Sequence, residues 1–269
     1  MKTGPAQTMT ARLRAVGSWL VDRSGMPAGA VLSLLFGLGL AALMGMGSAV
    51  LLDDVLDNKD LARFDRPVAH WLATHREPWL TSALLVVTRM GDAVWQTVWV
   101  VAVCLVAVYR SRSPLPAAAG AFGGAGIGLL IVTAKHLVGR QRPKLASEII
   151  PVDGFSFPSG HAAGAAAVGI VCAWVLCRWV VHRTTAQVAV WGATLTVVML
   201  IGFSRVYLGV HYVTDVLAGW LVGAAWAGVV IVISSWWPVA RRRGVALNGN
   251  GTPPAEKPGH ISFRGRYRE

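Results

Sequence analysis

Three clusters of polar residues interrupt an otherwise apolar chain, and each contains side chains that can bind anions or transfer protons. The first cluster runs from Lys135 to Pro143, the second from Pro158 to His161 and the third from Ser204 to Asp215. Together they contribute four cations, three histidines and a carboxylate. Arg offers planar bidentate donors and Lys a compact charge, a combination that suits an oxyanion with several negative oxygens. The residue types therefore indicate phosphate chemistry.

The second cluster places Ser159 and Gly160 directly before an apolar helical run. Ser159 is expected to be the N-cap of that helix, with the first free N–H groups facing the loop, and a helix N-terminus favours anions. Gly160 lets the backbone approach a ligand closely, so that His161 stands beside the bound group. An ordinary capping turn without a ligand is the alternative interpretation.

His211 and Asp215 in the third cluster are four residues apart, which places them on one face of a helix that begins near residue 211. The carboxylate can then hold one imidazole nitrogen and leave the other free to attack. A surface pair or a partial metal site has the same spacing. A metal is disfavoured because other ligands are few and the neighbouring Lys and Arg side chains repel a divalent cation. The cysteines lie inside apolar runs and are expected to be packing residues.

The elements that must position these clusters are expected to be membrane spans. Of the 269 residues, 54% are hydrophobic and only 14% are charged, whereas soluble domains carry about 25% charged residues. A span needs about 20 predominantly apolar residues. Stretches without Asp, Glu, Lys or Arg that reach or approach this length run over 24–52, 93–109, 113–134, 162–177, 184–204 and 216–240. The stretch 78–88 is too short to span, so we expect an interfacial or buried helix there.

Six spans place both termini on one side of the membrane, and the distribution of Lys and Arg indicates which side. With both termini in the cytoplasm, the inside segments hold 15 of the 25 Lys and Arg residues, as the positive-inside rule requires. All three polar clusters then lie at the extracytoplasmic face. The predicted fold is an all-α bundle of six transmembrane helices in the inner (cytoplasmic) membrane, with its active site at the extracytoplasmic face. The outside loop 135–161 is unusually cationic, which binding of an anionic substrate would explain.

The chain is expected to consist of a cytoplasmic segment over 1–25, a six-helix membrane domain over 26–238 and a basic cytoplasmic tail over 239–269. The Arg, Gly, Pro and Asn content of the tail predicts disorder. Its positive charge is typical of a topology determinant or of a contact with anionic lipids. The net charge of +12 is therefore assigned to membrane topology and an anionic substrate, and nucleic acid is not an expected partner.

The three clusters contain Lys-x6-Arg-Pro from Lys135, Pro-Ser-Gly-His from Pro158 and Ser-Arg-x5-His-x3-Asp from Ser204. In this order they resemble the complete three-part signature of the type 2 phosphatidic acid phosphatase (PAP2) superfamily, which also includes vanadium haloperoxidases and bacterial acid phosphatases. The motifs cover 135–215, and the six-span pattern extends the resemblance to roughly 26–238. The chain departs from the signature at no position.

The resemblance implies a role for each matching residue. Five residues match phosphate-binding positions: Lys135, Arg142, Ser159, Gly160 and Arg205. His211 corresponds to the nucleophile that forms a phosphohistidine, Asp215 to its orienting partner and His161 to the general acid. The phosphatase branch uses no metal or other cofactor. Arg140 receives no role from the resemblance.

The sequence therefore predicts a metal-independent lipid phosphatase that removes the terminal phosphate from a membrane lipid phosphate or diphosphate. The compact six-span chain resembles bacterial enzymes that recycle undecaprenyl diphosphate or dephosphorylate phosphatidylglycerophosphate, and of these substrates undecaprenyl diphosphate is favoured. Phosphatidylglycerophosphate and phosphatidate are alternatives, since the motifs recognise a terminal phosphate and not the tail. A vanadium haloperoxidase is disfavoured because that class is soluble. A non-enzymatic six-span anion transporter or scaffold is the alternative from a different class.

Overall fold

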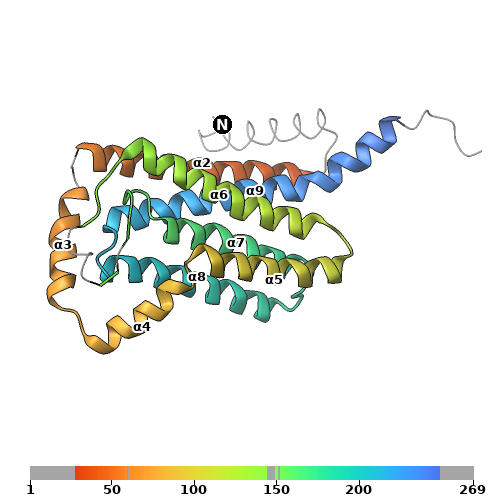
Figure 1. Ribbon diagram of the computed structural model, residues 1–269. Helices are drawn as coiled ribbons and strands as arrows, with labels where there is room; N and C mark the ends of the chain where they lie inside the picture. The colour runs from red at the N-terminus through yellow and green to blue at the C-terminus, as the bar shows by residue number, and fades with distance from the viewer. Residues whose placement is uncertain (1–27, 58, 60, 144–148, 151, 249–269) are drawn as a thin grey trace, which may run out of the picture. The chain divides into compact units, whose positions relative to one another are not determined.

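The computed structural model describes residues 28–57, 59, 61–143, 149–150 and 152–248, and within them the regular structure is entirely helical (Figure 1). The segment expected at 1–25 lies outside the described residues. Eight helices follow one another along the described chain: α2 (Ala28–Asp57), α3 (Ala62–Thr74), α4 (Pro78–Arg89), α5 (Ala93–Ser111), α6 (Leu115–Val138), α7 (Gly160–Trp179), α8 (Thr184–Tyr207) and α9 (Val213–Asn248).

Six of these helices are long and apolar enough to cross a membrane, with mean hydropathies between 1.5 and 2.3 over their most apolar windows. They are α2, α5, α6, α7, α8 and α9. The predicted all-α bundle of six membrane helices is confirmed, whereas the side of the membrane that each end faces stays a prediction. The helices extend past the charge-free stretches because charged residues such as Lys135 and Arg205 continue the last turn of a span.

Helix α7 is the most buried of the six spans, with 61% of its apolar window inside the protein. It packs against α5, α6 and α8, and alanine and glycine dominate its buried positions. Small residues allow helix backbones to approach closely. A Cβ atom at Gly219 of α9 would lie 2.7 Å from the carbonyl oxygen of Ser159. This close approach brings the start of α9 against the start of α7.

Two shorter helices, α3 and α4, connect the first span to the second. The predicted short helix at 78–88 is present as α4, whose Leu84 packs with Tyr207 and Leu208 at the end of α8. The sequence analysis did not predict α3. Its buried residues Ala62, Asp65 and Ala69 recur at helical spacing, the pattern of a helix with one face against the protein.

The chain divides into two compact units, residues 1–234 and 235–269. In the second unit, α9 continues as a helix to Asn248, although disorder was expected from residue 239. The Ala, Arg and Leu residues of 239–248 are good helix formers, which accounts for the difference. The rest of the predicted tail, 249–269, lies outside the described residues.

Candidate active site

The three polar clusters meet where α6 and α8 end and where α7 and α9 begin. The backbone N–H of Ser159 donates to the carbonyl oxygen of Asp215 at 2.9 Å, which joins the second cluster to the third. Arg142 Nη1 donates to the carbonyl oxygen of Val210 at 2.9 Å, which joins the first cluster to the third. The structure therefore brings the predicted site residues together from segments that are far apart in the sequence.

His211 and Asp215 form a buried pair with side-chain exposures of 2% and 0%. The imidazole Nδ1 lies 3.3 Å from Asp215 Oδ2, and the Nε2 lies 3.2 Å from Arg142 Nη1. A guanidinium can only donate hydrogen bonds, so Nε2 accepts and the ring proton resides on Nδ1. The pair therefore leaves the Nε2 lone pair directed at the cationic side of the site.

The charge state of His211 follows from its surroundings. Burial, with a smaller contribution from the Arg205 and Arg142 cations, lowers the pKa of the His211 imidazole from 6.5 to about 3 against the opposing effect of Asp215. A protonated ring would add a charge to a buried site that already holds cations. At neutral pH His211 is consequently neutral, the form in which Nε2 can act as a nucleophile.

Arg140 anchors the carboxylate of this pair. Its Nη1 donates to Asp215 Oδ1 at 2.6 Å and to Thr214 Oγ1 at 2.8 Å, and its Nη2 donates to Asp65 Oδ2 at 2.8 Å. Asp65 also accepts from the backbone N–H of Thr214 at 3.1 Å and from the hydroxyl of the same residue. A second anchor for Asp215 is the backbone N–H of Tyr212, at 2.9 Å.

The family resemblance gave no role to Arg140, and the sequence analysis did not consider Asp65. The sequence shows Arg140 only as a further basic residue inside the Lys-x6-Arg segment, and it does not mark Asp65 as buried. The two carboxylates are 1% and 0% exposed, whereas Arg140 is 15% exposed. Removing the guanidinium would leave two buried charges without their partner, so we interpret Arg140 as a positioning residue.

The expected phosphate-binding cations approach the site from α6, from the loop after it and from α8. Lys135 Nζ donates to the carbonyl oxygen of Phe155, and Arg142 Nε donates to that of Gly154 at 3.0 Å. Arg205 is 3% exposed and donates from Nη1 to Thr88 Oγ1 at 2.7 Å. Its Nε has no hydrogen-bond partner among the described residues. Such a buried donor suits an anion, because leaving it unpaired is costly.

Ser159 stands at the N-cap position of α7, as predicted, but its side chain makes no capping hydrogen bond. The hydroxyl is buried and has no partner among the described residues. Gly160 is the first residue of α7, and the first amides of a helix have no acceptor within it. The expected side-chain cap is therefore absent, and the Ser159 hydroxyl is available to a ligand beside the Gly160 amide.

His161 has its own carboxylate partner, which the sequence analysis did not identify. Its Nε2 lies 2.9 Å from Asp92 Oδ1, and the exposures of the two side chains are 24% and 48%. An ionised carboxylate only accepts, so Nε2 carries the proton and Nδ1 is the ring nitrogen that can face a substrate. Gly91 permits this contact, since a Cβ there would lie 2.8 Å from His161 Cδ2.

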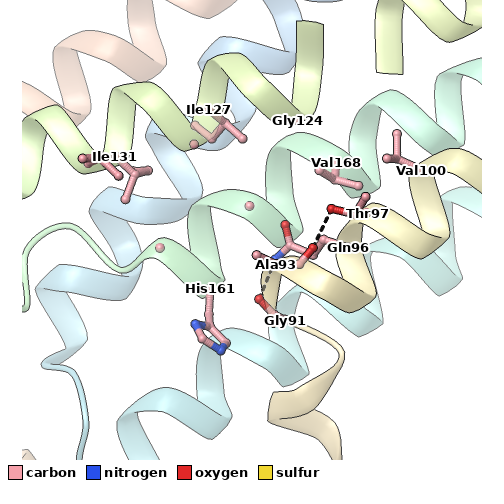
Figure 2. A pocket seen from close by; sticks show the side chains of 14 residues that line it. Gly91, Ala93, Gln96, Thr97, Val100, Gly124, Ile127, Ile131, His161 and Val168 are labelled. Atoms are coloured by element: carbon pink, nitrogen blue, oxygen red, sulfur yellow. Dashed lines mark hydrogen bonds between the residues drawn. The ribbon is translucent and has the colours of Figure 1, made fainter. Parts of the chain in front are cut away.

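An apolar groove of about 340 Å³ begins at His161 and runs between α5, α6 and α7 (Figure 2). Ile127 and Ile131 line its α6 side. On α5, Gln96 donates from Nε2 to the carbonyl oxygen of Gly91 at 2.7 Å, which satisfies one polar group inside the groove. The groove therefore offers an apolar surface that ends at an imidazole.

Comparisons with known proteins address the family of this chain. The sequence model of the PAP2 superfamily matches residues 116–238. Decaprenylphosphoryl-5-phosphoribose phosphatase from Mycobacterium tuberculosis is 35% identical over 139 residues, which cover 50% of this chain and 68% of that relative. The chain belongs to the PAP2 superfamily. The family that the three motifs resemble is thereby confirmed.

Two further similarities place this PAP2 protein among membrane members of the superfamily. Phosphatidylglycerophosphatase B from Bacillus subtilis is 39% identical over 95 residues, or 35% of this chain and 46% of that relative, so the match spans less than half of the relative's length. The crystal structure of a transmembrane PAP2-type phosphatidylglycerolphosphate phosphatase from Bacillus subtilis superposes with a TM-score of 0.67 at 25% identity. It covers 72% of this chain and 96% of that one.

Proposed function

We propose that this protein is a membrane lipid phosphatase that removes a terminal phosphate through a phosphohistidine at His211. The observation that carries the proposal is the neutral imidazole, whose Nε2 lies 3.2 Å from the Arg142 guanidinium while Nδ1 is held by Asp215. A nucleophile and a phosphate-binding cation thus share one location. Metal chemistry is not invoked, because the cationic side chains themselves neutralise the phosphate.

Phosphoryl binding is assigned to the cationic side of the site. Three side chains provide positive charge: Lys135, Arg142 and Arg205. The Ser159 hydroxyl and the Gly160 amide add uncharged donors, and the hydroxyl has no competing partner among the described residues. Such donors stabilise the charge that develops on the equatorial oxygens during phosphoryl transfer.

In the first step, His211 Nε2 attacks phosphorus, a P–N bond forms and the P–O bond to the lipid breaks. The Nδ1 proton stays between the ring and Asp215, which stabilises the positive imidazole that results. The leaving oxygen departs opposite the attacking nitrogen, and the imidazolium form of His161, which carries a proton on each ring nitrogen, supplies the proton from Nδ1. Asp92 holds His161 in position and stabilises its protonated form.

In the second step, His161 acts as a base and takes a proton from a water molecule that enters where the lipid left. The water oxygen forms a new bond to phosphorus as the P–N bond breaks, which releases orthophosphate and regenerates neutral His211. The lipid tail is assigned to the apolar groove, because this groove begins at the general acid and runs between α5, α6 and α7 (Figure 2). The head group alone enters the cationic site.

The substrate is proposed to be a polyprenyl diphosphate, with undecaprenyl diphosphate as the first candidate. The name of the mycobacterial relative refers to a polyprenyl lipid, whereas that of the Bacillus subtilis relative refers to phosphatidylglycerophosphate. Phosphatidylglycerophosphate and phosphatidate are therefore the alternatives to test. The site is proposed to face the extracytoplasmic side of the inner membrane with both termini in the cytoplasm, on the basis of the excess of Lys and Arg in the opposite segments.

The test is phosphate release by purified protein from undecaprenyl diphosphate, phosphatidylglycerophosphate and phosphatidate, with and without a chelator. We expect release that the chelator leaves intact and that orthovanadate, which resembles the transition state, inhibits. His211→Ala should abolish release, whereas His182→Ala is the matched control because His182 is exposed and precedes α8. Near-normal turnover of His211→Ala would exclude this nucleophile. Absence of release from every substrate would favour the anion transporter or scaffold.

A further inference from the structure

A second cavity, of about 850 Å³, adjoins the candidate active site on the side of Arg142. Its walls come from Val55 of α2, from α3, from the segment 140–143 and from Tyr212, and it shares no lining residue with the apolar groove at His161. Arg142 faces this cavity while it contacts His211 Nε2. The cavity therefore begins at the guanidinium that lies against the nucleophile.

The described lining of this cavity is cationic and includes no acidic side chain. Arg66 and His70 stand one turn apart on α3, where both are exposed and neither side chain has a hydrogen bond or ion pair with another described residue. Asp65 and Asp215 neutralise Arg140. Arg66, Arg142 and His70 consequently remain to attract an anion, and apolar walls such as Val55 and Ala69 strengthen that attraction by excluding water.

The direction of the reaction separates the two products. Attack and departure are in line at phosphorus, so the lipid leaves on the side of His161 and the phosphoryl group stays on the side of His211. The groove at His161 is apolar and suits the lipid product. The cavity beyond Arg142 is cationic and suits the product that is an anion.

We propose that this cavity is an orthophosphate-binding site through which the second product leaves, with Arg142 passing the anion to Arg66 and His70. The inference rests on the proposed phosphatase function. Arg66 supplies planar paired donors and His70 a further donor. Two exposed groups bind weakly enough to release the anion afterwards, because exposed ion pairs contribute little.

The first measurement is equilibrium binding of radiolabelled orthophosphate to the purified full chain in neutral detergent, which does not depend on turnover. The variant is Arg66→Gln/His70→Gln. The matched control is Arg63→Gln, since Arg63 is an exposed arginine of the same helix that does not line the cavity. We expect the double variant to bind orthophosphate about three- to tenfold more weakly than the wild type, and Arg63→Gln to bind like the wild type.

The second measurement is product inhibition of phosphomonoester hydrolysis. The inhibition constant for orthophosphate should rise about three- to tenfold in the double variant, and by more than the KM for the substrate. Equal binding and inhibition in the double variant and in Arg63→Gln would overturn the proposal, as would wild-type protein that binds no orthophosphate. Wild-type protein that binds orthophosphate through Arg66 and His70 but hydrolyses no phosphate ester would contradict the phosphatase function and not the anion site.

A phosphate group in the cavity could also belong to a membrane lipid, and nanodiscs separate the two sources. Orthophosphate binding is compared in nanodiscs of phosphatidylcholine and of phosphatidylglycerol. The product-exit assignment predicts similar affinities in the two membranes. If phosphatidylglycerol reduces the affinity for orthophosphate in the wild type but not in the double variant, a lipid head group occupies the cavity. That result would overturn the product-exit assignment.

Discussion

Replacing Asp92 with asparagine tests whether the carboxylate beside His161 serves the general acid. The substitution, Asp92→Asn, removes a negative charge and keeps the shape of the side chain. In the wild type the Asp92 Oδ1 lies 2.9 Å from His161 Nε2, a distance typical of a charge-assisted hydrogen bond. The neutral amide of the variant would no longer stabilise the protonated imidazole from which the leaving oxygen takes its proton.

The size of the effect follows from the exposure of the pair. Hydrogen bonds to charged groups contribute about 1.5–3 kcal/mol. Because Asp92 is 48% exposed, water screens the pair, and we expect about 1–1.5 kcal/mol. This corresponds to a loss of roughly five- to twelvefold in rate. Removing the whole acid in His161→Ala should cost roughly 10²–10⁴-fold.

The assay compares single-turnover rates on an alkyl phosphate monoester, a polyprenyl diphosphate and an activated aryl phosphate. An alkoxide needs a proton as the bond breaks, whereas a phosphate monoester or an aryl oxide is a much weaker base, so both variants should lose most on the alkyl ester. Asp53→Asn, which changes an exposed carboxylate in the last turn of α2, is the matched control. A uniform loss on all three substrates would refute the acid role: His161 would then bind phosphate, and Asp92 would only support the fold.

Three other predictions concern stability and topology. Arg140→Met should destabilise the protein by about 3–5 kcal/mol, since Asp65 and Asp215 are 1% and 0% exposed and lose their shared cation; an unfolding temperature equal to that of the wild type would contradict this. The folded-state pKa of His211 lies below its ordinary value of 6.5, at about 3. Between these pH values the unfolded chain therefore binds more protons than the folded protein. The contribution of His211 to stability is complete above pH 6.5 and is lost as the pH falls toward 3. Between about pH 6 and pH 4 the wild type should therefore lose up to about 1.4 kcal/mol per pH unit more than His211→Gln, and parallel pH profiles of unfolding would disprove it. In a chain without its native cysteines, an impermeant outside reagent should label Asp153→Cys, at an exposed position, and not Asn250→Cys; the reverse pattern would invert the proposed topology.

The sequence by itself determined the spans and the type of chemistry. Hydropathy over a window of helix length is a local property, so the six membrane helices could be found from composition alone. The pairing of His211 with Asp215 is also local, because the two residues are four apart in the sequence; His211 lies just before α9 begins at Val213, and Asp215 lies in the first turn of that helix. The limits of α9 were less predictable, since helix formers continue beyond the apolar stretch to Asn248.

Only the tertiary structure decided which groups hold His161 and Asp215. Asp92 lies 69 residues from His161, and Arg140 lies 75 residues from both Asp65 and Asp215. No short-range periodicity links such positions, and the pairs form only when the glycine-lined contacts of the bundle bring the helix ends together. The burial of His211 also depends on the tertiary structure. The neutral state of His211 depends on its exclusion from water by several helices at once, which the order of residues along one helix does not contain.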